Sequence, residues 1–174
     1  MLETLSKSIK NVERNNMIQI IEDFLDHYDL QYLEDTHTEC LPVTWYNIHE
    51  RHIYSDICHR MVEEGKKYYF DDEDIQGYEC WSQVNSKPSS MHYDKDETLW
   101  EQTEELSFPM CSTVLYFNVE SNLSGGLLNI ENDVFVKPKR NRLVIFSPGL
   151  LHGVEEFTGK RSSFLVNPWK TQPL

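Results

Sequence analysis

Two different spacings of apolar residues divide the chain near residue 77. Before this point the spacing is helical: apolar residues recur every three or four positions in MIQIIEDFLDHYDL, which begins at Met17, and again across residues 49–67. Gly65 is expected to end the second helix. The acidic run 71–74 then predicts a loop or the cap of a short turn, so the first third of the chain is expected to be mainly helical.

From residue 77 onward, short runs rich in β-branched and aromatic residues alternate with Gly, Pro and Asn, as is typical of strands and turns. No strand is followed by a helical pattern, which excludes an array of βαβ units. Antiparallel closure removes exposed sheet edges, so a mainly β (α+β) fold is predicted, a barrel or jelly roll with the N-terminal helices against one outer face. The expected strands are 78–85, 90–94, 111–118, 126–131, 134–136, 142–147, 152–157 and 162–167.

Length and charge narrow the class of protein further. The 174 residues suit a single domain, with 1–76 as a mainly helical support region and 77–170 as the β core. No apolar run approaches the roughly 20 residues of a membrane span, and the N-terminus lacks a signal-like apolar stretch, so a cytoplasmic location is expected. The net charge of −13 disfavours nucleic acid as a partner, whereas the locally basic region 137–174 suits a small dianionic ligand. Nothing in the sequence indicates an oligomeric state.

The cysteines and the first histidine cluster carry no recognisable motif. Cys40, Cys58, Cys80 and Cys111 are spaced unlike zinc or redox motifs, and reduced thiols, some of them buried, are expected. The tetrapeptide 49–52, His-Glu-Arg-His, resembles a zinc-protease motif only superficially because its histidines are three positions apart rather than four, so a surface helix is expected there.

The clearest chemical signal is the set His92, Asp94 and His152. Alternate side chains of a strand share a face, so His92 and Asp94 are expected to point to the same side of strand 90–94. Two imidazoles and one carboxylate bind one face of a non-haem Fe(II) ion and leave the other face open to substrate and oxygen. Zinc prefers tetrahedral sets of nitrogen and sulfur ligands, so the three residues predict an Fe(II) centre.

Arg161 and Ser163 repeat the same spacing on the last predicted strand. They can share one face, where a carboxylate would receive a bidentate arginine bond and a hydroxyl bond. Taken alone, His92 could be a surface or core histidine, Asp94 and Arg161 could be solvated residues, and His152 could lie in a turn. The joint pattern is much rarer, because residue order, strand context and arginine spacing must all agree.

Further residues are expected around this centre. Trp81 and Gln83 share a face of the strand before His92 and are predicted to line a substrate pocket, although Trp81 also fits core packing. Asn85 and Trp100 are placed at its mouth. The long segment 95–110 follows the expected metal ligands and is a candidate lid.

The stretch from about 77 to 169 resembles the Fe(II)/2-oxoglutarate-dependent dioxygenases, in particular the prolyl-4-hydroxylase-like group. That resemblance implies a double-stranded β-helix, a distorted jelly roll of eight strands, in agreement with the strand count above. The matching segments are GYECWSQVN, MHYDKDE, CSTVLYFN, GGLLNI, NRLVIFSPGLLHGV and GKRSSFLVNPW.

The resemblance also assigns roles to individual residues. It implies that iron is bound by His92, Asp94 and His152. It implies that Arg161 binds the C5 carboxylate of 2-oxoglutarate with help from Ser163, and that Tyr116 can form a hydrogen bond to this cosubstrate. The carboxylate of Asp94 favours hydroxylation, since halogenases of this family have a small residue in its place. After the Gly-Gly pair at 125–126 the family's usual Glu-Thr is Leu-Leu here, which weakens an assignment to peptidyl-proline.

The expected function is therefore hydroxylation of a C–H bond in a peptidyl substrate, with prolyl as one option, or in a free amino acid. The reaction would use Fe(II), 2-oxoglutarate and O2 and release succinate and CO2. The alternative is a cupin-like metal-binding protein or a 2-oxoglutarate sensor without efficient oxygenase activity. The pair Arg161 and Ser163 discriminates, because a simple metal-binding barrel needs no anchor for a dicarboxylate. A small molecule or a peptide remains open as the primary substrate.

Overall fold

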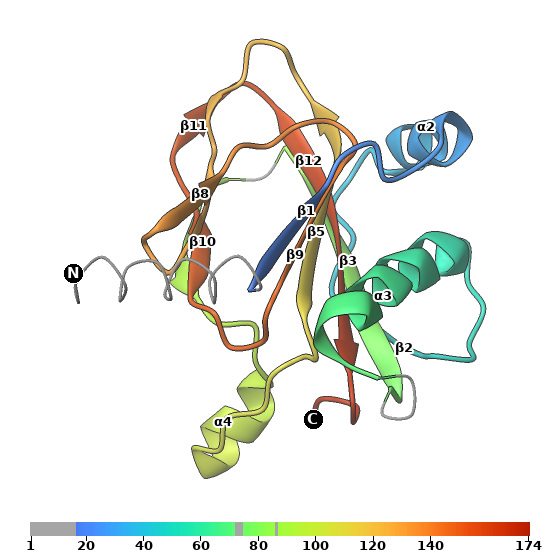
Figure 1. Cartoon of the computed structure of the whole chain (residues 1–174), viewed down its shortest axis with the longest axis vertical. Coiled ribbons are helices and arrows are strands. Elements are labelled where there is room, and N and C mark those ends of the chain that lie inside the picture. The colour runs from blue at the N-terminus through green and yellow to red at the C-terminus, as the bar shows by residue number, and fades with distance from the viewer. Residues whose placement is uncertain (1–16, 72–74, 86) are drawn as a thin grey trace, which may run out of the picture.

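The computed structural model describes residues 17–71, 75–85 and 87–174, which fold into two facing antiparallel sheets with helices outside the larger one (Figure 1). The larger sheet has the order β1-β9-β5-β12-β3-β2, the smaller has the order β4-β10-β7-β8, and β6 pairs with β11. The strands are β1 Ile18–Ile21, β2 Thr44–Asn47, β3 Gly77–Val84, β4 Ser89–His92, β5 Ser112–Val119, β6 Ser124–Gly125, β7 Leu128–Ile130, β8 Val134–Val136, β9 Arg142–Phe146, β10 His152–Val154, β11 Phe157–Thr158 and β12 Arg161–Trp169. The predicted mainly β jelly-roll fold is confirmed.

The larger sheet is buried on both faces, which explains why its central strands are almost continuously apolar. On β5, Val114 and Tyr116 pack against the smaller sheet, whereas Leu115 and Phe117 pack against the helices. The alternation follows from the two-residue period of a strand. One apolar layer therefore joins the two sheets and a second joins the larger sheet to the helices.

Two helices cover the outer face of the larger sheet, as predicted (Figure 1). Helix α2 (His27–Thr36) begins after Asp26, whose carboxylate accepts a hydrogen bond from the Asp29 backbone N–H at 2.9 Å, and it buries Leu30 and Leu33. Helix α3 (Ser55–Tyr69) buries Ile57, Cys58, Met61 and Val62. None of the described helices combines the length and the apolar character needed to cross a membrane.

The helical prediction for the start of MIQIIEDFLDHYDL is wrong. Residues Ile18–Ile21 form strand β1, which pairs antiparallel with β9. Isoleucine side chains suit a strand that lies at a sheet edge, and this long-range pairing outweighs the local helical spacing. Strand β2 was likewise not predicted, so region 1–76 adds two strands to the larger sheet as well as its helices.

The predicted limits of the second helix also change. Helix α3 starts at Ser55 rather than 49, because the preceding residues form a turn in which the Ser55 hydroxyl accepts the His52 backbone N–H at 2.7 Å. The helix continues through Gly65, where a Cβ would lie 2.7 Å from the Cys111 sulfur. Gly65 thus permits close packing instead of ending the helix. Of the predicted acidic loop 71–74, residues 72–74 lie outside the described part of the chain.

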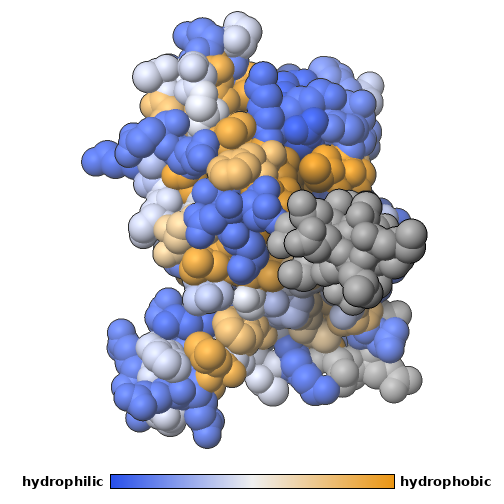
Figure 2. Space-filling model, turned by 60° about the vertical axis from the view of Figure 1, so that its left-hand side comes forward, coloured by the Kyte–Doolittle hydropathy of each residue, from blue (hydrophilic) through white to orange (hydrophobic). Residues whose placement is uncertain are grey.

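Every strand expected from the sequence has a counterpart in the structure. Strand β4 ends at His92 rather than 94, and the expected strand 152–157 is divided into β10 and β11. The segment 95–110 contains helix α4 (Glu97–Thr103), which is capped by Asp96 and projects from the body of the fold (Figure 1). Its surface, at the lower end of Figure 2, is mostly hydrophilic.

Candidate active site

Three predicted metal ligands meet where the smaller sheet faces the larger one. His92 ends β4 and His152 begins β10, and these two residues are directly paired in the sheet register. Their Nε2 atoms lie 3.8 Å and 3.5 Å from Asp94 Oδ1. One potential ligand atom from each residue lies within 4.8 Å of the others. Residues separated by up to 60 positions in sequence thus form one compact donor set.

Both imidazoles are oriented by the backbone behind them. His92 Nδ1 lies 2.8 Å from the Ser90 carbonyl oxygen, and His152 Nδ1 lies 2.9 Å from the Leu150 carbonyl oxygen. A carbonyl only accepts hydrogen bonds, so in each ring Nδ1–H is the donor. Nε2 of each ring is therefore the atom directed at Asp94, and it is the atom available to a metal, as in metal-binding histidines.

Asp94 lies two residues beyond the end of β4, so the prediction that one strand face carries both His92 and Asp94 is wrong. Its carboxylate is held instead by the larger sheet. Oδ2 accepts hydrogen bonds from the Ser112 hydroxyl at 2.6 Å and from the Asn167 side-chain amide at 2.9 Å. These bonds leave Oδ1 directed toward the histidines, which is what a monodentate metal ligand requires.

The electrostatics keep the carboxylate ionised. Burial alone would raise the pKa of Asp94, but the hydrogen bond and charge attraction from His152, together with Ser112 and Asn167, lower that pKa to about 2. The site therefore presents one anionic oxygen and two imidazole nitrogens, a donor set that suits Fe(II).

Sequence reasoning missed Ser112 and Asn167, although a signal for both was present. On β12, Asn167 follows Arg161, Ser163 and Leu165 at two-residue spacing. On β5, Ser112 is two and four residues before Val114 and Tyr116. Following this two-residue period to the ends of the strands would have placed both side chains on the pocket face.

Replacing Ser112 by alanine is expected to weaken Fe(II) binding about tenfold, because groups that orient a ligand typically contribute factors of 10–100 to metal affinity. The variant loses the 2.6 Å bond to Asp94 but keeps the ligand itself. Competitive titration with a colorimetric chelator measures the change. Ser162→Ala is the matched control, since Ser162 is similarly buried but is not a hydrogen-bond donor to Asp94; equal affinities of the two variants would contradict the role of Ser112.

A small cavity of about 80 Å³ leads from the metal ligands to Arg161 and Ser163. Arg161 is only 2 % exposed, and it forms no ion pair with any of the described residues. Its Nη1 donates to the Gly126 carbonyl at 2.9 Å, and its guanidinium lies 4.9 Å from the centre of the Tyr116 ring. Burial lowers the pKa of Arg161, which reflects the cost of a buried charge without a counter-ion.

Three buried polar atoms near this cavity have no hydrogen-bond partner within the described protein: Arg161 Nε, Ser163 Oγ and Tyr116 Oη. Buried polar groups are almost always paired, and a buried arginine normally has an anion beside it. The three atoms belong to residues predicted to contact 2-oxoglutarate, with Arg161 and Ser163 at its C5 carboxylate. A dicarboxylate would satisfy both requirements, so the residues present fit 2-oxoglutarate.

A second, larger pocket of about 330 Å³ opens from His92 and Asp94 toward solvent. Trp81, predicted for the substrate pocket, lines both this pocket and the inner cavity, whereas Gln83, predicted for the same pocket, lines only the inner cavity. Asn85 and Trp100 line neither of the two, which corrects their expected place at the mouth. Asn85 follows β3 with its N–H bonded to the Arg161 carbonyl, and Trp100 lies on α4 under the ammonium of Lys95.

The outer pocket also contains acidic and aromatic side chains that were not predicted to line it, among them Glu79, Tyr93, Asp96, Glu97 and Trp169. Burial raises the pKa of Glu79, although its carboxylate accepts a 2.9 Å hydrogen bond from the Trp169 indole N–H. Residues 95–98 of the predicted lid segment form part of the wall. Closure of this segment stays a prediction.

The family model of the 2OG-Fe(II) oxygenase superfamily matches residues 81–170, which is more than half of the chain. The chain belongs to this superfamily. The 2OG-Fe(II) oxygenases are dioxygenases that use Fe(II), 2-oxoglutarate and O2, and the protein is such an enzyme. Among curated proteins, no sequence matches the chain.

Solved structures of this superfamily share the fold. A prolyl-4-hydroxylase from Pseudomonas putida is 18% identical over 89% of this chain and 93% of its own, with a TM-score of 0.64. A viral collagen prolyl hydroxylase from Paramecium Bursaria Chlorella virus-1, in a 2OG complex, is 14% identical over 90% and 97%, with a TM-score of 0.61. A Trichoplax adhaerens prolyl hydroxylase in complex with a hypoxia inducible factor peptide fragment is 15% identical over 97% and 90%, with a TM-score of 0.54. The fold is thus prolyl-4-hydroxylase-like.

Proposed function

We propose that this 2OG-Fe(II) oxygenase hydroxylates a C–H bond of a peptidyl or free amino-acid substrate, and that 2-oxoglutarate is converted to succinate and CO2. The observation that carries the proposal is the buried, unpaired Arg161 at the inner end of a cavity whose other end holds the His92, Asp94 and His152 donor set. A dicarboxylate anchor beside a metal site is what the cosubstrate of such an oxidation requires.

In this proposal His92, Asp94 and His152 hold Fe(II), and Arg161 with Ser163 holds the far carboxylate of 2-oxoglutarate, with Tyr116 as a further donor. Bound Fe(II), 2-oxoglutarate and O2 together supply the oxidising power. The protein supplies position: the carbonyls of Ser90 and Leu150 orient the imidazoles, and the larger sheet holds Asp94.

The outer pocket is the proposed place of the substrate. The metal ligands His92 and Asp94 form part of its wall, and Trp81 lines both the outer pocket and the inner cavity. The carboxylates of Glu79, Asp96 and Glu97 favour a neutral or cationic substrate over an anionic one. The Trichoplax relative is in complex with a peptide fragment, which supports a peptide as the first class to examine.

A cupin-like metal-binding protein without cosubstrate is not favoured, because it would leave the buried Arg161 without an anion. A 2-oxoglutarate sensor differs from the proposed enzyme in rate only, so the same assay separates the two.

The deciding experiment measures succinate formed from 2-oxoglutarate by the Fe(II)-loaded protein in the presence of peptides, including proline-containing ones, and of free amino acids. A substrate is expected to stimulate succinate formation and to gain the mass of one oxygen atom in equal amount. His152→Ala serves as the inactive control. Slow succinate formation that no candidate stimulates would favour the sensor, and failure to bind 2-oxoglutarate would overturn the proposal.

A further inference from the structure

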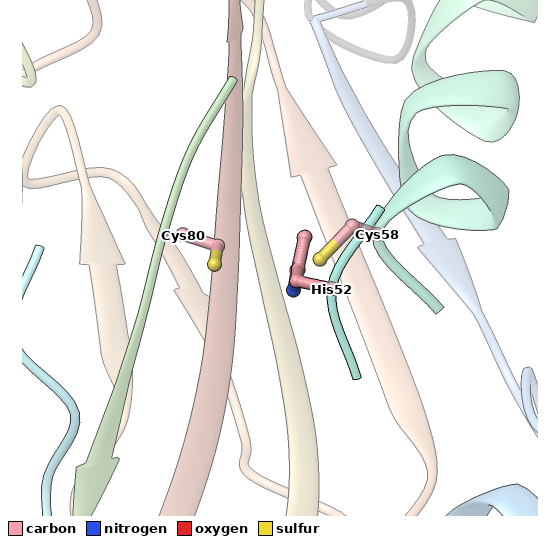
Figure 3. A group of neighbouring side chains, drawn as sticks. All are labelled: His52, Cys58 and Cys80. Carbon is pink, nitrogen blue, oxygen red and sulfur yellow. The ribbon is translucent and has the colours of Figure 1, made fainter. Parts of the chain in front are cut away.

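Outside the oxygenase site, a second group of metal-ligand side chains comes together from three parts of the chain (Figure 3). His52 lies in the turn before α3, Cys58 lies in the first turns of α3, and Cys80 lies on β3. One potential ligand atom from each lies within 4.8 Å of the other two. Cys58 and Cys80 are buried and His52 is partly exposed. These residues are called the Cys–His cluster below.

The cluster is separated from the oxygenase site by strand β3. Tyr78 and Cys80 point from β3 into the core beneath α3, whereas Trp81 and Gln83 point from the opposite face into the oxygenase pockets. This follows from the alternation of side chains along a strand. A ligand bound at the cluster would therefore contact α3 and β3 but none of the iron ligands.

The donor types and their spacing suit zinc. Two thiolates and one imidazole are a common zinc set, with Zn–S distances of about 2.3 Å and Zn–N distances of about 2.0–2.1 Å. Two sulfur ligands of a tetrahedral site then lie about 3.8 Å apart. Since the ligand atoms already lie within 4.8 Å of one another, a shift of about 1 Å or less closes the site.

Protonation in the cluster is compatible with binding. Burial raises the pKa of the Cys58 thiol, and the adjacent Cys80 adds to this effect, so without a cation the Cys58 sulfur remains a neutral thiol. Burial lowers the pKa of His52, which keeps its imidazole neutral and able to donate a lone pair. A cation would therefore displace thiol protons on binding, as zinc does at structural cysteine sites.

A route into the cluster exists. A cavity of about 240 Å³ is lined by His52 and Cys80, with Leu41, Pro42, Tyr46 and Thr44 among its other wall residues. The cavity gives a cation access to two of the three ligands. It also leaves room for a water molecule at the fourth position of a tetrahedral ion.

The ring of His52 is held in place by hydrogen bonds that a cation could replace. Its Nε2 lies 2.8 Å from the Tyr78 hydroxyl, and its Nδ1 accepts a longer 3.3 Å bond from the Tyr54 backbone N–H. The ring also stacks on Tyr46 at a centroid distance of 3.8 Å. Binding a cation replaces one of the two hydrogen bonds and leaves the stacking contact intact.

We propose that His52, Cys58 and Cys80 form a zinc site that ties the start of α3 to β3 and is independent of the oxygenase iron. Reduced thiols that merely fill the core offer no reason for an imidazole within 4.8 Å of both sulfurs and an access cavity at the same place. All four cysteines are free in the structure, so the sulfurs of the cluster are available.

The test uses the full chain, reduced and freed of metal with a chelator, and titrated with Zn2+ or with Co2+ as a spectroscopic substitute. Wild type is expected to show a thiolate-to-cobalt charge-transfer band, which the iron ligands cannot produce because they include no sulfur. Excess Zn2+ should abolish the band. His152→Ala should retain the band, and this result separates the cluster from the oxygenase site even if the proposed hydroxylation fails.

Variants identify the ligands. Cys58→Ser and Cys80→Ser are each expected to bind Co2+ and Zn2+ at least about tenfold more weakly. Cys111→Ser is the control for loss of a buried thiol, and Cys40→Ser is the control for an exposed one; both should keep wild-type affinity. Zn2+ should raise the melting temperature of wild type and of these controls but not of the two ligand variants.

The proposal is overturned if wild type shows no thiolate band, or if Cys58→Ser and Cys80→Ser retain it. The wild-type spectrum decides the question even if a ligand variant fails to fold. A band lost equally in Cys40→Ser or Cys111→Ser would assign the binding to other thiols and would also overturn it.

Discussion

Replacing Arg161 by alanine is expected to raise the 2-oxoglutarate concentration for half-maximal turnover by about 100-fold while Fe(II) affinity stays unchanged. Removing one partner of a buried charge pair costs about 2–5 kcal/mol, and each 1.4 kcal/mol corresponds to about a tenfold change in affinity. A loss near 3 kcal/mol gives the expected factor. Steady-state succinate formation at varied 2-oxoglutarate, with a parallel Fe(II) titration, measures both quantities.

The prediction has two internal controls. Arg161→Lys keeps a positive charge without the planar bidentate donor pair and is expected to fall between wild type and alanine. Arg142→Ala removes another largely buried arginine; this one pairs with Glu22 and does not line the inner cavity, so the cosubstrate requirement should stay unchanged. An unaltered requirement in Arg161→Ala would remove this residue from the cosubstrate site, whereas equal loss of iron and 2-oxoglutarate binding would indicate misfolding.

Replacing His152 by alanine is expected to abolish iron-dependent turnover. His152 Nε2 lies 3.5 Å from Asp94 Oδ1, and the residue is only 6 % exposed. Residues that only orient a ligand contribute factors of 10–100 to metal affinity, so loss of a ligand itself should reduce Fe(II) affinity by more than about 100-fold. Chelator competition and the succinate assay measure the two effects.

His27→Ala is a suitable control, because His27 begins α2 and is exposed. It should behave as wild type in both assays. If His152→Ala retained a normal rate at saturating iron, His152 would not belong to the ligand set, and the donor group would have to be reassigned around His92 and Asp94.

Much of this site could be predicted because its residues lie on strands with a two-residue period. Arg161 and Ser163 on β12, and Trp81 and Gln83 on β3, were expected to share a face, and all four line the same cavity. The alternation of strand-like runs and turn residues after residue 77 likewise predicted the strands that both sheets take from that part of the chain. Local sequence is informative here because strand geometry fixes the direction of each side chain.

Other features depended on contacts between distant segments. The helical spacing after Met17 gave a wrong prediction, because Ile18–Ile21 is stabilised more by pairing with β9 than by a local helix. Asp94 lies beyond its strand because Ser112 and Asn167, 18 and 73 residues away, bind its carboxylate. The Cys–His cluster has no motif at all, since α3 and β3 meet only in the folded chain.

The sequence by itself determined the class of fold, the superfamily and the donor types of the oxygenase site, because side-chain chemistry and strand periodicity are local properties. Only the tertiary structure decided that Arg161 is buried without a counter-ion, that Asp94 is held from the opposite sheet, and that His52 meets Cys58 and Cys80. Burial and the approach of distant side chains arise when sheets and helices pack together, and no local pattern encodes them.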